Sequence, residues 1–248
     1  MTADTAPRPF QDRVILVTGA GQGIGRCAAL TLAAQGATVI LLGKSTRKLE
    51  AVYDEIEQAG HPQPALFPLD LAKADTAGFE GLAGAIAGQI GRLDGILHNA
   101  AWLESLCPLV DESLDRWLKT LRINLAAPFA LTRACLPLLQ AAPDASILMT
   151  SDDHGHVPAA YWGVYAISKA GVEALVRQWA QELEIHPQLR INAIIPGKIA
   201  SPQRRRTHPG EKPGLRSGPE ALMEEYLYWL GPQSRGRSGE ITECAAGR

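Results

Sequence analysis

Short apolar runs alternate along the chain with longer segments of helical period. The runs VILVT and TVILL are typical, because they are rich in β-branched residues and leucine. Between such runs, apolar residues recur at spacings of three and four, as on the buried face of a helix. This alternation is typical of a parallel sheet covered by helices on both faces, so we predict a doubly wound α/β fold. A last strand near GEITE would lie at a sheet edge. The other predicted strands are 14–18, 38–42, 65–69, 95–99, 146–150 and 191–195, and the predicted helices are 23–36, 46–59, 74–90, 112–140, 162–186 and 219–230.

The length and charge of the chain restrict its organisation and its partners. We predict one domain over residues 1–248, and the net charge of −2 gives no general attraction to nucleic acid. The start, MTADTAPRPFQDR, lacks the apolar core of a signal peptide, and no apolar run reaches the roughly 18 residues of a membrane span. We therefore expect a cytoplasmic protein with a flexible stretch at 1–11 and no membrane partner. The four cysteines form no CxxC pair, which predicts reduced thiols and no metal site.

A glycine-rich turn follows the first predicted strand. Gly19, Gly21, Gly23 and Gly25 lie where the chain passes from this strand into the first helix. Residues without a Cβ allow a sharp turn and the close approach of a pyrophosphate, and the free N–H groups of the new helix attract the anion. Strand, turn and helix in this order predict a dinucleotide site rather than a purely structural turn.

The end of the second strand indicates which dinucleotide is bound. NAD-binding proteins place a carboxylate there, which accepts a hydrogen bond from the ribose 2′-OH, whereas a cation suits a 2′-phosphate. This chain has Lys44 and Ser45 after Gly43. We therefore predict NADP(H) in preference to NAD(H), the alternative being that Lys44 is simply a solvated charge.

Several motifs together resemble those of the short-chain dehydrogenase/reductase family. They are TGAGQGIG at 18–25, Asp70, HNAA at 98–101, Asn124 in RINLAAPF, YAISK at 165–169 and PGKIAS at 196–201. The resemblance extends from about residue 12 to the end, and YWGVYAISK and the C-terminal stretch resemble the YciK-like bacterial oxidoreductases. It implies a Rossmann-type, mainly parallel seven-stranded sheet and hydride transfer between a nicotinamide and a carbonyl or alcohol.

The resemblance also implies a role for individual residues. Tyr165 would exchange a proton with the substrate oxygen, and Lys169, one helical turn further on, would lower the pKa of the tyrosine and hold the nicotinamide ribose. Asn124 would interrupt its helix and position a water molecule. The residues implied to bind the cofactor are Gly19, Gly21, Gln22, Gly23, Ile24, Gly25, Lys44, Ser45, Asp70, Leu71, Asn99, Ala100, Tyr165, Lys169, Pro196, Gly197, Ile199 and Ser201.

One catalytic position departs from the family pattern. The family has a serine three residues before the glycine that is Gly155 here and thirteen before the tyrosine, and both counts lead to Asp152. Ser151 is adjacent, but alternate residues of a strand face opposite sides, so it should point away. An ionised Asp152 only accepts hydrogen bonds, and loss of a donor to the reacting oxygen costs about 10²–10³ in rate.

Three arrangements would restore activity. Asp152 could be protonated and act as the donor, or the substrate could carry a cation or hydroxyl that Asp152 binds. His154, His156 or Tyr161, which follow on the same loop, could supply the donor instead. Both histidines could equally belong to a polar loop without a catalytic role.

The segment 198–218 changes character. From 201 on, SPQRRRTHPGEKPGLRSG is rich in proline, glycine and arginine, and it would leave the sheet where ligands bind. We predict a lid over the substrate; a surface loop or an oligomer contact is the alternative. The cluster RRR at 204–206 would attract an anionic substrate or face solvent, since the whole chain lacks the basic excess of nucleic-acid-binding proteins.

Two functions remain open from the sequence. The first is an NADP(H)-dependent oxidoreductase acting on a small carbonyl or alcohol, slowed or specialised by Asp152. The second is an NADP(H)-binding pseudoenzyme or scaffold that has kept Tyr165 and Lys169. By resemblance, we expect a homodimer or homotetramer that associates through the helices at 112–140 and 162–186.

Overall fold

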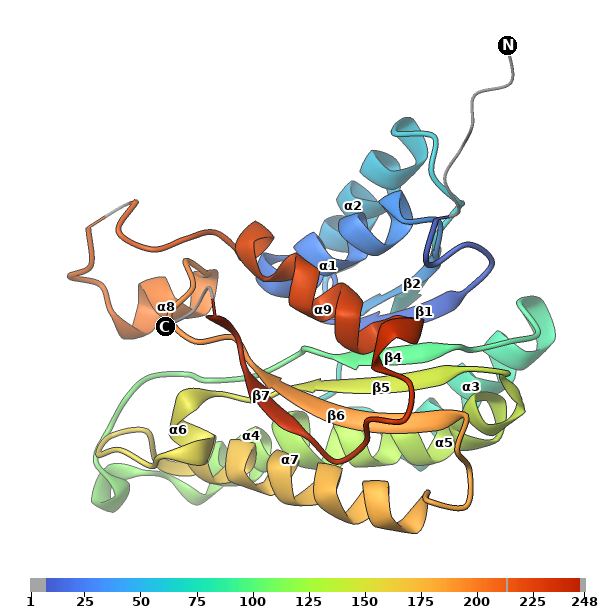
Figure 1. Cartoon of the computed structure of the whole chain (residues 1–248). Coiled ribbons are helices and arrows are strands. Elements are labelled where there is room, and N and C mark those ends of the chain that lie inside the picture. Colours follow the sequence, from blue (N-terminus) through green and yellow to red (C-terminus); the bar gives the residue numbers. More distant parts are fainter. Residues whose placement is uncertain (1–7, 213, 246–248) are drawn as a thin grey trace.

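The computed structural model describes residues 8–212 and 214–245, which build one parallel sheet of seven strands (Figure 1). The order is β3-β2-β1-β4-β5-β6-β7, and every neighbouring pair is parallel. The chain therefore winds outward from β1 in both directions, and the predicted fold is confirmed. The strands are β1 Val14–Thr18, β2 Thr38–Gly43, β3 Ala65–Pro68, β4 Gly95–His98, β5 Ala145–Thr150, β6 Leu189–Ile195 and β7 Ile241–Glu243.

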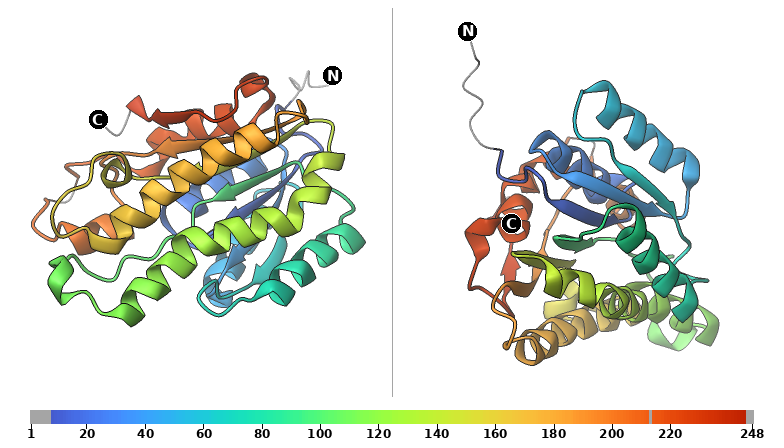
Figure 2. Two further views of the ribbon diagram at one scale, coloured as in Figure 1. Left: turned by 90° about the horizontal axis from the view of Figure 1, so that it is seen from below. Right: turned by 90° about the vertical axis from the view of Figure 1, so that its right-hand side faces the viewer.

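Helices cover both faces of the sheet (Figures 1 and 2). One face packs against α1, α2 and α9, and the other against α3, α5 and α7. Because the strands are apolar on both faces, each layer buries its own hydrophobic core. The long helices are α1 Gly23–Ala34, α2 Thr46–Gln58, α3 Thr76–Gln89, α4 Leu114–Leu121, α5 Ala127–Ala141, α7 Gly163–Glu182 and α9 Met223–Leu230; short ones are η1 Leu109–Asp111, α6 Asp153–His156, α8 Pro202–Thr207, η3 Pro219–Leu222 and η4 Pro232–Ser234.

The prediction of a single helix over 112–140 is wrong. The chain forms α4, then a π-helical turn, η2 Arg122–Ala126, and then α5. Proline has no backbone N–H, so Pro128 cannot donate the helical hydrogen bond to the carbonyl of Asn124 four residues earlier. A wider turn accommodates this break, and π turns of this kind are frequent at functional sites.

The prediction of a flexible N-terminus over 1–11 is also wrong in part. Residues 1–7 lie outside the described residues, but Phe10 is only 1% exposed and packs in the same core as α1 and α9. Its backbone N–H donates to the carbonyl of Gln35 at 3.2 Å. A polar sequence around one phenylalanine gave no periodic signal, so its burial could not be predicted from pattern alone.

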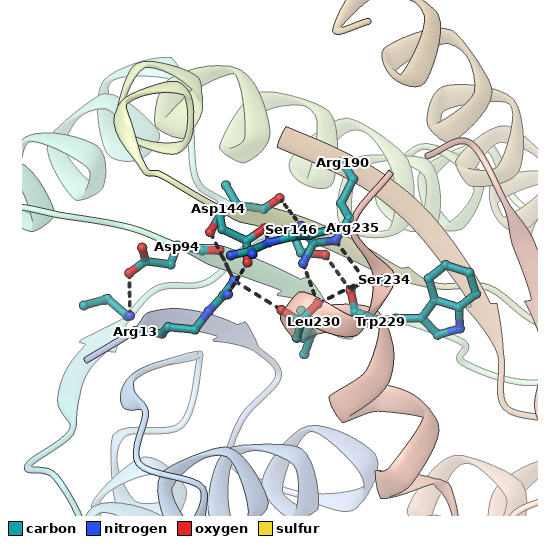
Figure 3. A network of polar contacts seen from close by, with 12 residues as sticks. Arg13, Asp94, Asp144, Ser146, Arg190, Trp229, Leu230, Ser234 and Arg235 are labelled. Atoms are coloured by element: carbon teal, nitrogen blue, oxygen red, sulfur yellow. Dashed lines mark hydrogen bonds and ion pairs between the residues drawn. The ribbon is translucent and has the colours of Figure 1, made fainter. Parts of the chain in front are cut away.

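A buried ionic network fastens the C-terminal end of α9 to the sheet, at the edge opposite the carboxyl ends of the strands (Figure 3). Asp144 lies at its centre and pairs with Arg13, with Arg190 at 2.6 Å and with Arg235 at 3.1 Å. Arg190 also donates to the carbonyl of Gly231 at 2.6 Å, just beyond α9. Burial disfavours the charge of Asp144, but hydrogen bonds from Arg190, Arg13 and Arg235 lower its pKa to about 2.

No helix within 8–212 or 214–245 is long and apolar enough to cross a membrane.

Candidate active site

A cavity of about 670 Å³ lies along the carboxyl ends of the strands. Its lining comes from the turns that follow β1 to β6 and from the start of α7 and α8. In open α/β sheets this edge is where ligands bind, at the point where the strand order reverses. Of the predicted cofactor residues it brings together Gly19, Gly21, Gln22, Gly23, Ile24, Lys44, Ser45, Asp70, Leu71, Asn99, Ala100, Tyr165, Lys169, Pro196, Gly197, Ile199 and Ser201.

The glycine turn forms one end of this cavity. Gly19 and Gly23 have φ of +70° and +58°, which side chains with a Cβ rarely adopt. Gln22 precedes α1 without capping it by its side chain, so the first N–H groups of α1 lack this partner. The turn therefore fits the pyrophosphate of a dinucleotide.

Gly25 is the one predicted cofactor residue that does not line the cavity. A Cβ at this position would lie 2.4 Å from the carbonyl oxygen of Gly19 and 2.6 Å from Nδ2 of Asn99. Gly25 therefore permits the close packing of α1 against the turn. Its contribution to cofactor binding is indirect, through the shape of the turn.

Positive charge surrounds the end of the cavity beyond β2. Lys44 and Lys119 lie over the ring of Trp102, with their Nζ atoms 5.2 and 4.1 Å from its centroid. Lys48, on the first turn of α2, donates a hydrogen bond to Oε1 of Gln22. Three lysines and one tryptophan therefore line this end of the cavity, together with Gln22. Such a region suits a phosphate and a planar base.

Tyr165 and Lys169 lie on the cavity face of α7, and both are buried. The Tyr165 hydroxyl donates to Oδ2 of Asp152 at 3.2 Å and accepts from Nε2 of Gln203 at 2.8 Å. Lys169 Nζ donates to the carbonyl of Thr150 at 2.6 Å. Burial lowers the pKa of Lys169 to about 8, against the opposing effect of the Asp152 charge. Burial, and then the charge of Asp152, raises the pKa of Tyr165 well above its ordinary value.

Asp152 occupies the position predicted for it, opposite Tyr165. Its Oδ1 accepts from the backbone N–H of His154 at 3.0 Å and contacts Nδ1 of the same residue at 2.8 Å. Burial disfavours the charge, but these hydrogen bonds and the charge of Lys169 lower the pKa of the Asp152 carboxyl below its ordinary value. The structure therefore favours an ionised Asp152 and gives no support to the neutral, donating form.

His154 is the only one of the three candidate donors that contacts Asp152 within the described residues. Its ring stacks on that of Trp162, with centroids 3.6 Å apart and an interplanar angle of 18°. His156 instead approaches Oε2 of Glu173 at 3.2 Å, and Tyr161 is 60% exposed. The hydroxyl of Ser151 points away from Tyr165, as predicted, and donates to Glu173 at 2.9 Å.

Asn124 lies in the π-helical turn behind Lys169. Its Oδ1 accepts from the N–H of Trp102 at 2.7 Å, and its Nδ2 donates to the Trp102 carbonyl and to Oγ of Ser168, both at 3.0 Å. Asn124 and Lys169 line a second cavity of about 10 Å³, roughly the space of one water molecule. The predicted interruption of the helix at Asn124 is thus present.

The segment predicted as a lid contains a helix, α8. Ser201 caps this helix by accepting from the N–H of Arg204 at 3.1 Å. Arg204 and Arg206 both line the cavity, and Arg204 is also paired with Glu211 at 2.6 Å; Arg205 is exposed and does not line it. The segment therefore brings a neutral donor, Gln203, and the two guanidinium groups of Arg204 and Arg206 to the cavity wall.

Comparison with known proteins assigns the family. The sequence model of the short chain dehydrogenase family matches residues 13–212. The chain belongs to the short-chain dehydrogenase family. The oxidoreductase YciK of Escherichia coli K12, itself described as uncharacterized, is 40% identical to this short-chain dehydrogenase over 96% of the chain and 94% of YciK. The resemblance to YciK-like oxidoreductases is thereby confirmed.

Solved structures of short-chain dehydrogenases superpose closely on this one. A protein from Shigella flexneri 2a complexed with NADP has a TM-score of 0.92 at 39% identity, over 96% of this chain and 99% of the other. A protein from Escherichia coli CFT073 complexed with NADPH has a TM-score of 0.92 at 39% identity, over 96% and 98%.

Some site residues of this short-chain dehydrogenase were missed from the sequence. Thr18 accepts from the backbone N–H groups of Asn99 and Ala100, both at 3.0 Å, and so joins the ends of β1 and β4. Gln203 and Trp102 were missed because their neighbours are distant in sequence. Lys48 and Lys119 were missed as well, although the position of Lys48 four residues after Lys44 was a usable signal.

Proposed function

We propose that this short-chain dehydrogenase is an NADP(H)-dependent oxidoreductase that transfers hydride between the nicotinamide and a small carbonyl or alcohol substrate. The observation that carries the proposal is that Tyr165 and Lys169 are buried side by side in the wall of the cavity that begins at the glycine turn. Such a pair supplies a proton where the substrate oxygen gains or loses charge.

The residues present fit a dinucleotide. The turn at Gly19 and Gly23 would hold the pyrophosphate, and Lys169 would hold the nicotinamide ribose. Pro196 and Gly197 would border the nicotinamide. When bound, the nicotinamide would give or take the hydride, while the chain positions the substrate and moves the proton.

Tyr165 would exchange that proton at its hydroxyl oxygen. Because its pKa is raised, the hydroxyl is neutral, which suits donation to a substrate oxygen that becomes negative. The hydrogen bond from Gln203 acts against this rise in the pKa of Tyr165. The Lys169 ammonium lies 5.7 Å from the Tyr165 ring centroid, and Asn124 would fix the small cavity behind Lys169. An ionised Asp152 acts against Tyr165 by accepting its hydrogen.

Preference for NADP(H) would come from the cations beyond β2. Lys44 lies where a carboxylate would repel a 2′-phosphate, and Lys48 and Lys119 line the same end of the cavity. The relatives that were solved with NADP and NADPH support this proposal.

We further propose that the enzyme is a homodimer or homotetramer. Phe129 on α5 and Ile167 on α7 are 42% and 47% exposed, and both lie on the helices expected to associate. Burial of these side chains against a second copy would remove apolar surface from water.

A scaffold that binds NADP(H) without turnover is the second candidate, and the ionised Asp152 favours it. The test is NADPH oxidation with a panel of small ketones and aldehydes by the wild type and Tyr165→Phe. The enzyme is supported if wild-type turnover is lost in Tyr165→Phe. Binding of NADPH without any turnover supports the scaffold.

A further inference from the structure

The reaction centre offers an unusual set of hydrogen-bonding roles to a substrate. The single hydrogen of the Tyr165 hydroxyl is directed at Oδ2 of Asp152, at 3.2 Å. A carboxylate has no hydrogen to give, so Asp152 only accepts. Tyr165 and Asp152 together therefore present lone pairs to the cavity, and the hydrogen between them is already engaged.

His154 holds Asp152 in this state. Both contacts from His154 go to Oδ1, at 3.0 and 2.8 Å, which leaves Oδ2 to Tyr165 and the cavity. The stack of His154 on Trp162 fixes the orientation of the imidazole. Asp152 also precedes α6 as its N-cap, so its backbone and side chain are both fixed.

Gln203 indicates which partner these atoms prefer. Its Nε2 donates to the oxygen of Tyr165 at 2.8 Å, so a neutral donor fits against the Tyr165 oxygen. A hydroxyl group of a ligand can take the same role, because it carries a hydrogen. A ketone oxygen carries none, so it can form no hydrogen bond to the lone pairs of Asp152 or of the Tyr165 oxygen.

We propose that this centre selects a hydroxyl donor, so that the substrate of the oxidoreductase proposed above binds as an alcohol in preference to the corresponding ketone. The alcohol would donate its hydrogen to Oδ2 of Asp152 or to the oxygen of Tyr165. In this arrangement Asp152 is a specificity-determining residue, and His154 is a positioning residue that acts through it. The inference rests on the proposed function for the identity of the site and its ligand class.

The test uses complexes that cannot react. Enzyme saturated with NADPH is titrated with an alcohol, and enzyme saturated with NADP⁺ is titrated with the ketone, so that no hydride can pass. The probes are cyclohexanol with cyclohexanone and 1-phenylethanol with acetophenone, with dissociation constants from calorimetry. The ratio of the two constants is compared between the wild type and Asp152→Ser, which cancels the effect of the cofactor's own charge.

We expect the preference for the alcohol to fall about 10- to 100-fold in Asp152→Ser, because one hydrogen bond to a charged group is lost. His154→Ala should weaken the preference, whereas His154→Asn, which retains an N–H near the position of Nδ1, should restore it. His156→Ala is the matched control, because His156 contacts Glu173 instead and should leave the ratio unchanged.

Equal or tighter binding of the ketone by the wild type would overturn the inference. So would a ratio that Asp152→Ser leaves unchanged, or a failure of the wild type to bind either probe pair. These measurements require no turnover. An alcohol preference in a protein that binds NADPH but never transfers hydride would therefore contradict the proposed function and leave the selection of a hydroxyl donor intact.

Discussion

Replacing Asp152 by serine should convert this protein into a faster reductase of generic ketones. The change removes the carboxylate that accepts the Tyr165 hydrogen at 3.2 Å and introduces a hydroxyl that can donate to the substrate oxygen. A donor of this kind contributes about 10²- to 10³-fold in rate, roughly 3–4 kcal/mol. Loss of the Asp152 charge also removes the second-largest cause of the raised pKa of Tyr165.

One effect works against this gain. The charge of Asp152 raises the pKa of Lys169, so its removal should move that pKa below about 8 and leave less of the ammonium at neutral pH. We therefore expect a gain of about 100-fold, at the lower end of the range for such a donor. The decrease in Lys169 charge should be smallest below about pH 7, so the gain should be largest there.

The assay is the initial rate of NADPH oxidation with cyclohexanone and acetophenone. Asp153→Ser is the matched control, because Asp153 is the neighbouring carboxylate and does not line the cavity. The Asp153 charge is a smaller cause of the raised pKa of Tyr165 than burial and Asp152, so the rate should change far less than in Asp152→Ser. An Asp152→Ser variant that binds NADPH as the wild type does and yet reduces ketones no faster would rule out this effect of the Asp152 carboxylate.

Three further predictions concern the cofactor, the acid–base pair and the fold. Lys44→Ala should weaken NADPH binding about tenfold and leave NADH binding unchanged in calorimetry, since a charge contact to phosphate is roughly 1.4 kcal/mol; equal wild-type affinities for the two cofactors would contradict the assignment. Turnover should fall as pH rises through about 8, because Lys169 then loses its proton, and a flat pH–rate profile to about pH 9 would exclude this role. Asp144→Asn should lower the free energy of unfolding by about 3–5 kcal/mol in urea titrations, because it leaves buried arginines unpaired. The pKa of Asp144 is depressed, so its stabilising effect is present above its ordinary value of 3.8 and is lost as pH falls toward about 2; a urea midpoint unaffected by Asp144→Asn would contradict this role.

The sheet could be predicted from the sequence because each strand is a short apolar run bounded by turns. The run at 14–18 coincides with β1, and the others differ from their strands by one or two residues at an end. The glycine turn was equally readable, since its chemistry is local. The break at Asn124 was implied only by the family resemblance; the helical period predicted one helix through it, although Pro128 four residues later was a usable signal.

The substrate side of the site could not be predicted to the same extent. The role of Gln203 depends on α8 folding back against Tyr165, a contact between residues 38 positions apart. The ionisation of Asp152 depends on the balance between burial and the hydrogen bonds from His154, and neither quantity is visible in a motif. Proximity in sequence suggested three candidate donors, and only the three-dimensional arrangement distinguishes His154 from the others.

Isotope transfer can follow hydride transfer with Tyr165 as the proton donor. NADPH deuterated at the transferable position is incubated with a ketone that the protein reduces, and the alcohol is analysed by mass spectrometry. We expect deuterium at the carbinol carbon with the wild type and a loss of about 10²-fold or more in its rate of incorporation with Tyr165→Phe. Undiminished incorporation in Tyr165→Phe, or binding of NADPH by the wild type without incorporation into any ketone or aldehyde of the panel, would contradict this expectation.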